Sequence, residues 1–452
     1  MPSTNRKKLV VKLLKYLVLV LLILGSLYVG FYIYLAVQPD DPPFDDSALI
    51  PDRQEIPPEQ NGYETLVSAL GGNGELPADY FRDLLALDVS SEVRETEGEP
   101  FRNQKLDSIE KFKEKYHPVY TSLQKVFDYL HLDIPRGDDS RTGSISIAIR
   151  EMVIYALMLS WYEAKQGNDD ASLEYIDFVL HFGKMMNNSR GYLTLFVMGA
   201  VAQQKALVEI HEMIDSDVMP SSALLELSAM LNLHAPSLEN WEEIMKDEYE
   251  WHTYLLLEGN WIEEQNLVSR LTYGHIMKPN MFRKGIFEVY HPVFEMHKKP
   301  IYEFDHNIWD SLCDLNNADN LSYIDEAKRA SEVIGRIQGC MAAPNFSRFW
   351  ETTFYYKTVW NMTHLKIAIL MYESENGNIP TTIELLTPDF IASIPIDPYD
   401  GKPLKYDPDR NLIYSSGFNF ADDGGSYEKH LVEHNFYFPR LKEEKDIALI
   451  IH

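Results

Sequence analysis

One uncharged apolar run near the N-terminus places the strongest limit on how this 452-residue chain can fold. The run covers residues 16–37 and, as a helix, extends for about 33 Å, which is enough to cross the hydrocarbon core of a bilayer. Tyr16 lies at one end and Tyr32 and Tyr34 at the other, where aromatic rings favour the headgroup region. The run therefore predicts a retained membrane anchor.

Positive charge lies on one side of this run. The five basic residues that precede it are Arg6, Lys7, Lys8, Lys12 and Lys15. Because such flanks stay in the cytoplasm, everything after Gln38 is expected on the outer side. A cleaved signal peptide is the alternative, but its apolar region is normally ~7–15 residues long, and no Ala-x-Ala site follows here. We therefore expect a single-pass protein of the cytoplasmic (inner) membrane, with its C-terminal domain in the periplasm or outside.

The remainder of the chain is strongly acidic. All 69 acidic residues but only 36 of the 41 basic residues lie beyond residue 38, which leaves a formal charge of about −33 there. Such a surface repels nucleic acid and anionic headgroups, because phosphate binding requires Lys and Arg patches. Solubility is the simplest explanation of the acidic composition. Cation binding and a saline habitat are more specific alternatives. The expected partners are the membrane, through the N-terminal helix, and envelope proteins, but no nucleic acid.

Two cysteines occur in the chain, Cys313 and Cys340. An oxidising exterior permits a disulfide, and closing a loop of this length is worth ~3 kcal/mol. The alternative is a pair of buried free thiols. Spacing along the chain does not show whether the two Cβ atoms meet, so both interpretations stay open.

The distribution of charge, proline and apolar residues divides the chain into four regions. These are a cytoplasmic basic tip with the anchor at 1–38, a Pro-rich linker at 39–60, an α-helical domain at 61–345 and a C-terminal domain at 346–452. Roughly 410 residues outside the membrane exceed what one core usually organises, which favours two domains. The linker is acidic and poor in apolar residues, so it should be extended and stiff.

Helical periodicity dominates the region 61–345. The expected helices are Tyr63–Leu70, a hairpin within Ile149–Phe182, and Leu193–Ile214. Gly167 should end the first helix of the hairpin, and Asn168-Asp169-Asp170 should provide the N-cap of the second. Gly199 should allow close packing of the third helix. The hairpin resembles one tetratricopeptide unit, but no repeat of about 34 residues follows, so packed helical hairpins are expected.

The last part of the chain changes from a helical to a turn-rich pattern. A helix is expected over 346–376, because an apolar stripe ends there at Asn376-Gly377, a pair that favours the left-handed region. A helical turn is expected at Ile383–Leu386. Strands are expected at Leu404–Asp407, Leu412–Ser415, Phe436–Phe438 and Ile447–Ile451.

Three turn-rich segments follow the expected helix. They are Tyr372-Glu-Ser-Glu-Asn-Gly377-Asn-Ile-Pro380, then Ile396-Asp397-Pro398-Tyr399-Asp400-Gly401, then Tyr414-Ser-Ser-Gly417 with Asp422-Asp423-Gly424-Gly425. In this order they resemble the C-terminal domain of type II secretion major pseudopilins. The resemblance implies a long helix packed on a small antiparallel β-sheet. With the N-terminal transmembrane helix and the mainly α-helical hairpin domain, the expected class is α+β.

The order of regions also resembles membrane-anchored helical proteins of planctomycete-type bacteria that end in a pseudopilin-like tail. The residues that carry this resemblance are Asn61-Gly-Tyr63 after the linker, the hairpin with Trp161, and Met277-Lys-Pro279-Asn280 in mid-chain. The resemblance implies no known activity.

One polar cluster indicates a candidate ion site. Asp422 and Asp423 precede Gly424-Gly425 in a loop that begins at Gly417, and carboxylates with backbone carbonyls in a Gly-bent loop suit calcium. The pseudopilin resemblance implies calcium in the equivalent loop. The alternative is a polar turn held by Asp side-chain to backbone hydrogen bonds. Asp397 is interpreted as such a structural turn residue.

The motifs of common catalytic sites are absent or incomplete. His211-Glu212 lacks the second histidine of a zinc motif, so His211 is interpreted as part of a solvated helix end. Glu248 and His252 lie one turn apart, but their spacing does not match a di-iron bundle. No Gly-x-Ser-x-Gly elbow, phosphate loop or dinucleotide fingerprint occurs.

Three functions therefore remain, and no reaction is identified. The first is a membrane-anchored extracytoplasmic protein that acts by binding or scaffolding. The second is a pseudopilin-like component related to type II secretion, although about 310 residues separate the anchor from the C-terminal domain. The third is an envelope enzyme, which would need a cleft that gathers several of Glu242, Glu243, Asp247, Glu248 and His252.

Overall fold

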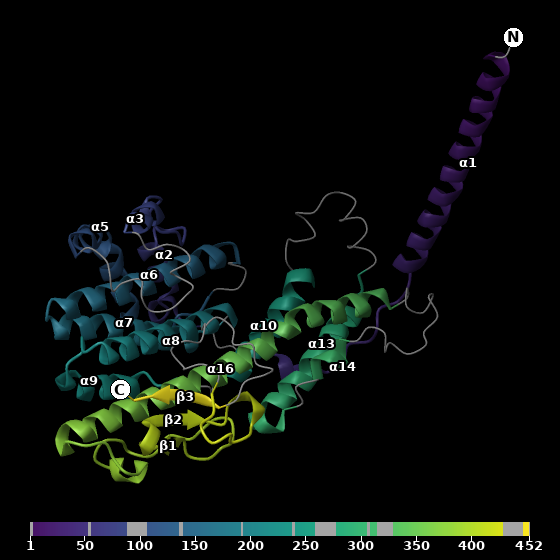
Figure 1. The fold of residues 1–452 in the computed structure, drawn as a ribbon. Coiled ribbons are helices and arrows are strands. Elements are labelled where there is room, and N and C mark those ends of the chain that lie inside the picture. Colours follow the sequence, from purple (N-terminus) through teal and green to yellow (C-terminus); the bar gives the residue numbers. More distant parts are fainter. Residues whose placement is uncertain are drawn as a thin grey trace. The chain divides into compact units, whose positions relative to one another are not determined.

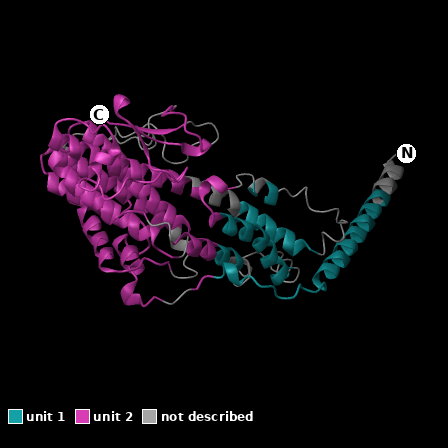
Figure 2. Cartoon of the chain, turned by 90° about the horizontal axis from the view of Figure 1, so that it is seen from below, with its two compact units in different colours: residues 1–50, 249–296, 305–344 teal, residues 51–248, 297–304, 345–452 magenta. Residues whose placement is uncertain are grey.

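The computed structural model describes residues 3–52, 56–87, 106–134, 139–190, 193–236, 240–257, 277–304, 308–313, 329–427 and 446–451 (Figure 1). The chain is mostly helical with a small antiparallel sheet, which confirms the α+β class. It divides into two compact units (Figure 2). Unit 1 comprises residues 1–50, 249–296 and 305–344, and unit 2 comprises residues 51–248, 297–304 and 345–452. The domain limits expected from the sequence remain predictions.

Unit 1 contains the N-terminal helix. Two of its helices lie wholly within it, α1 (Ser3–Ala36) and α14 (Ile308–Cys313). It also contains α10 (Trp241–Leu257) from residue 249 onward, α13 (Pro279–His297) up to residue 296 and α16 (Ala330–Asn376) up to residue 344. The segment Lys12–Ala36 of α1 has a mean hydropathy of 2.3, and none of it is buried. An apolar helix of this length with no protein cover is compatible with a membrane anchor.

Two other helices are also long and apolar enough to cross a membrane, Gly143–Lys165 and Leu193–Asp215. By length and composition alone, three helices of the described residues could therefore cross a membrane. Both of these helices belong to unit 2, where 72% and 67% of their apolar windows are buried inside the protein. A helix that is apolar almost all round and covered by protein is what a large helical core contains.

Glycines bring α13 and α16 into backbone contact within unit 1. A Cβ at Gly335 of α16 would overlap the carbonyl oxygen of Phe282, and a Cβ at Gly285 of α13 would overlap that of Glu332. Gly339, one turn after Gly335, faces Val289. Small residues at this spacing permit close helix crossing, so these glycines are required by packing and not by backbone conformation.

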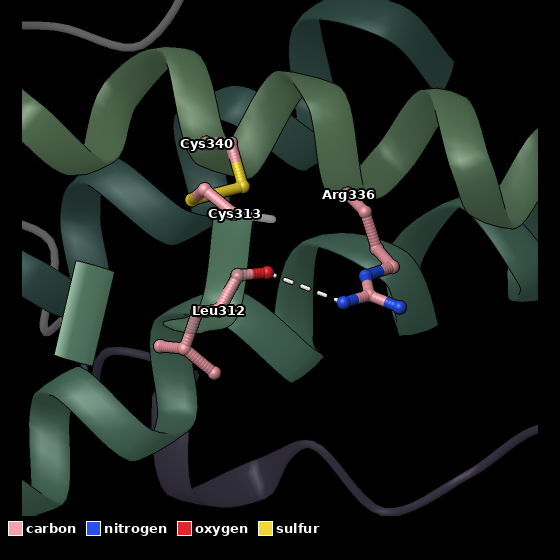
Figure 3. Close-up of a disulfide and its surroundings, with 4 residues drawn as sticks. All are labelled: Leu312, Cys313, Arg336 and Cys340. Atoms are coloured by element: carbon pink, nitrogen blue, oxygen red, sulfur yellow. Dashed lines mark hydrogen bonds between the residues drawn. A yellow bond between two sulfur atoms is a disulfide. The ribbon is translucent and has the colours of Figure 1, made fainter. Parts of the chain in front are cut away.

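A disulfide joins Cys313 at the end of α14 to Cys340 on α16 (Figure 3). Their Cα atoms are 5.6 Å apart, within the usual range for a disulfide. Beside the bond, Nη2 of Arg336 donates to the carbonyl oxygen of Leu312 at 3.2 Å. Of the two alternatives that the sequence left open, the structure has the paired cysteines.

Unit 2 contains the helical hairpins. Its helices before α10 are α2 (Tyr63–Ala69), α3 (Tyr80–Ala86), α5 (Leu106–Gln124), α6 (Asp139–Lys165), α7 (Asp169–Asn187), α8 (Leu193–Asp215) and α9 (Leu224–Leu233). The three predicted helical segments are confirmed. Gly167 has a φ of 76° and ends α6 as expected. Asn168 occupies the N-cap position of α7 as expected, but its side chain makes no capping bond, because its amide donates to Glu163.

Close packing of α7 on α8 depends on Gly183 and Gly199. A Cβ at Gly199 would lie 2.9 Å from the amide nitrogen of Asn187 and nearer still to the carbonyl oxygen of Gly183. The interpretation of Gly199 as a packing residue is therefore correct. Its partner, Gly183, was expected in a loop after Phe182, but it lies within α7, which continues to Asn187.

The long helix α16 begins at Ala330, earlier than the predicted start at residue 346, and ends at Asn376 before Gly377 with a φ of 75°. A 3-10 turn (Ile383–Leu386) follows as predicted. The three-stranded sheet has the order β1 (Lys405–Asp407), β2 (Leu412–Ser415) and β3 (Ile447–Ile450), all antiparallel. These strands confirm three of the four predicted ones, and Phe436–Phe438 lies outside the described residues.

The part of α16 within unit 2 is buried beside α8. The hydroxyl of Tyr356 donates to the side-chain oxygen of Gln203, and Nε2 of His211 lies 2.8 Å from Oγ1 of Thr363. His211 is 1% exposed. The prediction that it lies on a solvated helix end is wrong, because α16, which is distant in sequence, covers that end of α8.

Candidate functional site

The predicted ion loop lies between β2 and β3. It begins with a 3-10 turn (Gly417–Asn419) and continues through Asp422 and Asp423, both of which are exposed. Gly424 and Gly425 have φ values of 69° and 72°, a conformation that side chains other than glycine rarely adopt. The loop therefore has the exposed carboxylates and the glycine bend that the sequence indicates.

Asp446, the residue before β3, holds this loop closed. Its carboxylate accepts a hydrogen bond from the amide of Asp423 at 3.2 Å and one from the amide of Gly425 at 2.7 Å. Burial raises the pKa of Asp446, and the nearby charges of Asp422 and Asp423 raise it further, while the two amide bonds oppose this. The carboxylate of Asp446 therefore lies at the same loop as those of Asp422 and Asp423 and bonds to the loop backbone.

A guanidinium group occupies the carbonyl side of the same loop. Nη2 of Arg410 donates to the carbonyl oxygen of Gly424 at 2.6 Å, and Nη1 donates to that of Gly425 at 3.2 Å. Nε of Arg410 donates to Asp407, and this contact lowers the pKa of the Asp407 carboxyl. These carbonyl oxygens are the kind of ligand that a calcium ion in the loop would take.

The side chains of the two predicted ligands are partly committed to the loop. Oδ1 of Asp422 accepts from the amide of Gly424 at 2.9 Å, and Oδ2 of Asp423 accepts from the side-chain amide of Asn419 at 2.7 Å. Among the residues described, no three His, Cys, Asp or Glu side chains are arranged to hold a metal ion. Calcium takes six to eight oxygens, and two of the carboxylate oxygens already accept hydrogen bonds within the loop. Calcium binding at Asp422 and Asp423 remains a prediction.

Neither Asp446 nor Arg410 was among the residues that the sequence indicated. Arg410 sits in the β1–β2 turn and Asp446 is separated from Asp423 by a long stretch of chain. The antiparallel register of β2 and β3, in which Ser415 pairs with Ile447, brings Asp446 to the loop. The available signal was an aspartate directly before a predicted strand.

Asp397 has the structural role that its turn motif indicates. It is fully buried, and its carboxylate accepts from the amide of Tyr399, the hydroxyl of Ser415 and the amide of Ser416. The Lys405 ammonium lies 3.5 Å away. A buried carboxylate with this many donors is satisfied by the protein, so it holds the start of the C-terminal sheet together.

The acidic stretch of α10 directs its side chains to separate partners. Oε1 of Glu248 accepts from the amide of Leu193 at the start of α8, at 2.7 Å. Nδ1 of His252 lies 2.9 Å from the hydroxyl of Tyr290, and Glu243 pairs with Lys246. Burial raises the pKa of Glu248 to about 7, with the Leu193 amide opposing and Asp247 adding to the shift.

Contacts that sequence reasoning missed lie where the chain leaves α1. Nζ of Lys278 donates to the carbonyl oxygen of Ala36, the last residue of α1, at 2.9 Å. The carboxylate of Asp40 accepts from the amides of Asn280 and Met281 in the first turn of α13. An aspartate in this position satisfies two of the free amides of a helix N-terminus and complements its dipole.

The segment after Asp40 also packs on unit 1. Asp46 is 8% exposed and accepts from the hydroxyl of Tyr249 at 2.8 Å and from Arg283. The rings of Phe44 and Phe287 meet edge to face at 5.4 Å. The first part of the Pro-rich segment is therefore bound to α13 by charge, hydrogen bonds and an aromatic contact, in addition to the stiffness that its prolines confer.

No protein-family model, curated protein or solved structure matches this chain. The fold and these contacts define a mainly helical α+β protein with an N-terminal apolar helix compatible with a membrane anchor.

Proposed function

We propose that this protein is a single-pass, membrane-anchored extracytoplasmic protein that acts by binding or scaffolding other envelope proteins. The observation that carries the proposal is the bond from Lys278 to Ala36, together with the Asp40 cap on α13. A flexible tether would need no such contacts. These bonds attach the end of the membrane helix to a folded unit, as expected of a protein that must hold a surface at the membrane.

The disulfide supports an outer location for unit 1. Disulfides persist in oxidising compartments and are rare in the cytoplasm. The basic residues in the first turns of α1 support the same orientation, because such clusters stay in the cytoplasm. The two arguments are independent, since one rests on a covalent bond in unit 1 and the other on charges at the far end of α1.

The side of the membrane on which the C-terminus lies and the redox state of the two cysteines test this proposal. A reporter that is active only outside the cytoplasm, fused after His452, should be active, whereas a reporter active only in the cytoplasm should be silent. Thiol labelling of the unfolded, unreduced full-length protein should find no free cysteine. Activity of the cytoplasmic reporter, or two labelled thiols, would count against the proposal.

A scaffold must also have a stable partner. Cross-linking of the full-length protein in intact cells with a reagent that does not cross the membrane should give the same cross-linked product in every preparation. An Asp40→Ala variant, which loosens the attachment of α13 to the segment that follows α1, should lower the yield of that product. Recovery of the uncross-linked chain alone would contradict a scaffolding role.

One observation favours a second candidate, a pseudopilin-like component related to type II secretion. A long helix that ends at Gly377 is followed by a small antiparallel sheet, in the order that the resemblance implies. Co-purification with secretion-system components would support this candidate. Normal secretion after deletion of residues 377–452 would oppose it.

A further inference from the structure

The first turns of α16 present an apolar face that the described protein does not cover. Val333, Ile334 and Ile337 are 37%, 36% and 40% exposed, and Met341 is 70% exposed. At 100° per residue these positions share one side of the helix. Gly335 and Gly339, which pack on α13, lie on the other side. The helix is therefore apolar toward the outside and close-packed toward its own unit.

This face lies beside the end of the membrane helix. Lys278 donates through its side chain to the carbonyl oxygen of Ala36, and its amide donates to Oγ of Ser331 at 2.8 Å. A single residue thus bridges the last turn of α1 and the first turn of α16. Val333 and Ile334 lie two and three residues after Ser331, and Ile337 comes one turn later, which is about 9 Å along the helix axis from Ser331.

We propose that Val333, Ile334 and Ile337 insert into the lipid interface around α1 and so form a second, shallow membrane contact of unit 1. Helices with an apolar face beside the membrane bury it about 5–10 Å into the boundary between headgroups and acyl chains. The strongly acidic chain makes attraction to anionic headgroups unfavourable, so this contact depends on apolar burial. The inference rests on the proposed membrane anchoring of α1.

Site-specific photo-cross-linking of the full-length protein in native membranes tests the inference. The membranes carry alkyne-labelled fatty acids, and a benzophenone amino acid replaces one residue at a time. Leu24 on α1 reports the anchor, Ile337 reports the proposed contact, and Leu225 on α9, which is 69% exposed, is the matched apolar control in unit 2. All three positions are exposed, so the substitutions should leave folding intact, and an intact disulfide verifies this for each variant.

The inference expects lipid adducts at Leu24 and Ile337, with a yield at Ile337 several-fold above that at Leu225. A yield at Ile337 no higher than at Leu225, with Leu24 labelled, would overturn the second contact and leave the anchor in place. A product of twice the chain mass at Ile337 would assign the face to a second copy and would also overturn it. Loss of lipid adducts at both Leu24 and Ile337 would overturn the anchor as well.

Discussion

The ammonium group of Lys366 is fully buried and lies 2.6 Å from Oδ1 of Asp215, so that α16 is joined to the C-terminal end of α8 by an ion pair. Burial lowers the pKa of Lys366, and the carboxylate of Asp215 opposes that shift. This pair continues the series of contacts between α8 and α16 that includes His211 and Thr363. The part of α16 from residue 345 onward is therefore part of the core of unit 2.

Removal of one partner of this pair should be strongly destabilising. Asp215→Ala leaves a buried ammonium without its counter-ion, and such changes cost about 3–5 kcal/mol. Lys366→Met removes the charge and keeps the volume, so it should cost clearly less. Urea unfolding of the full-length protein in detergent at pH 7 compares the two variants.

The pH dependence of Asp215→Ala provides a second measurement. The unfolded Lys366 keeps its proton up to about pH 10.5, whereas the buried one loses it at lower pH, so stability should rise as the pH increases toward that value. Equal stability of Asp215→Ala and the unmutated chain at pH 7 would contradict this account.

Glu248 should make unit 2 less stable as the pH rises. Its folded-state pKa of about 7 exceeds the ordinary value of 4.5, so the folded state binds a proton that the unfolded state releases between these values. The stabilisation present below about pH 4.5 is lost as the pH rises to 7, and it corresponds to roughly 3 kcal/mol. Glu248→Gln keeps an acceptor for the Leu193 amide without the charge.

The measurement is the unfolding midpoint of both proteins at pH 5 and pH 8. We expect Glu248→Gln to be the more stable protein at pH 8 and to lose most of the difference at pH 5. A difference that does not change with pH would mean that Glu248 does not titrate in this range.

Gly335→Ala should disturb unit 1 because the added methyl overlaps the Phe282 carbonyl in α13. Overpacking of this kind costs typically 1–3 kcal/mol. Gly143→Ala in α6 is the matched control, because a Cβ there meets no atom within 4 Å. It should stabilise the protein by about 0.5–1 kcal/mol, since alanine is the better helix former. Thermal melting measures both, and equal effects of the two substitutions would contradict the close crossing of α13 and α16.

Calcium, if it binds the Gly417–Gly425 loop, should raise the stability of the folded protein by about 2.7 kcal/mol at a hundredfold excess over the dissociation constant. Asp422→Ala and Asp423→Ala should each remove most of that gain, because a hard cation loses a charged oxygen. Asp409→Ala, an exposed aspartate outside the loop, is the control. The full-length protein is melted with calcium and with chelator, because α16 packs on α8. Identical melting points would leave Asp422 and Asp423 as ordinary turn residues.

Several local predictions agree with the structure because short-range rules produce them. The helix stops at Gly167 and Gly377 depend on a left-handed residue, and the three confirmed strands depend on turns between short apolar runs. Asn168 shows the limit of such rules. The sequence offers it as a cap, but Glu163 of α6, across the turn between α6 and α7, takes its side-chain amide.

The sequence by itself determined the apolar N-terminal helix, the helical hairpins and the short strands, because periodicity and turn residues act within a few positions. The tertiary structure decided which distant residues meet. It buried His211 under α16, brought Asp446 to the loop of Asp422 through the β2–β3 register, and bound Asp40 to the start of α13. The physical reason is that such contacts depend on packing of whole elements, and a linear pattern carries no record of which buried donor will face which acceptor.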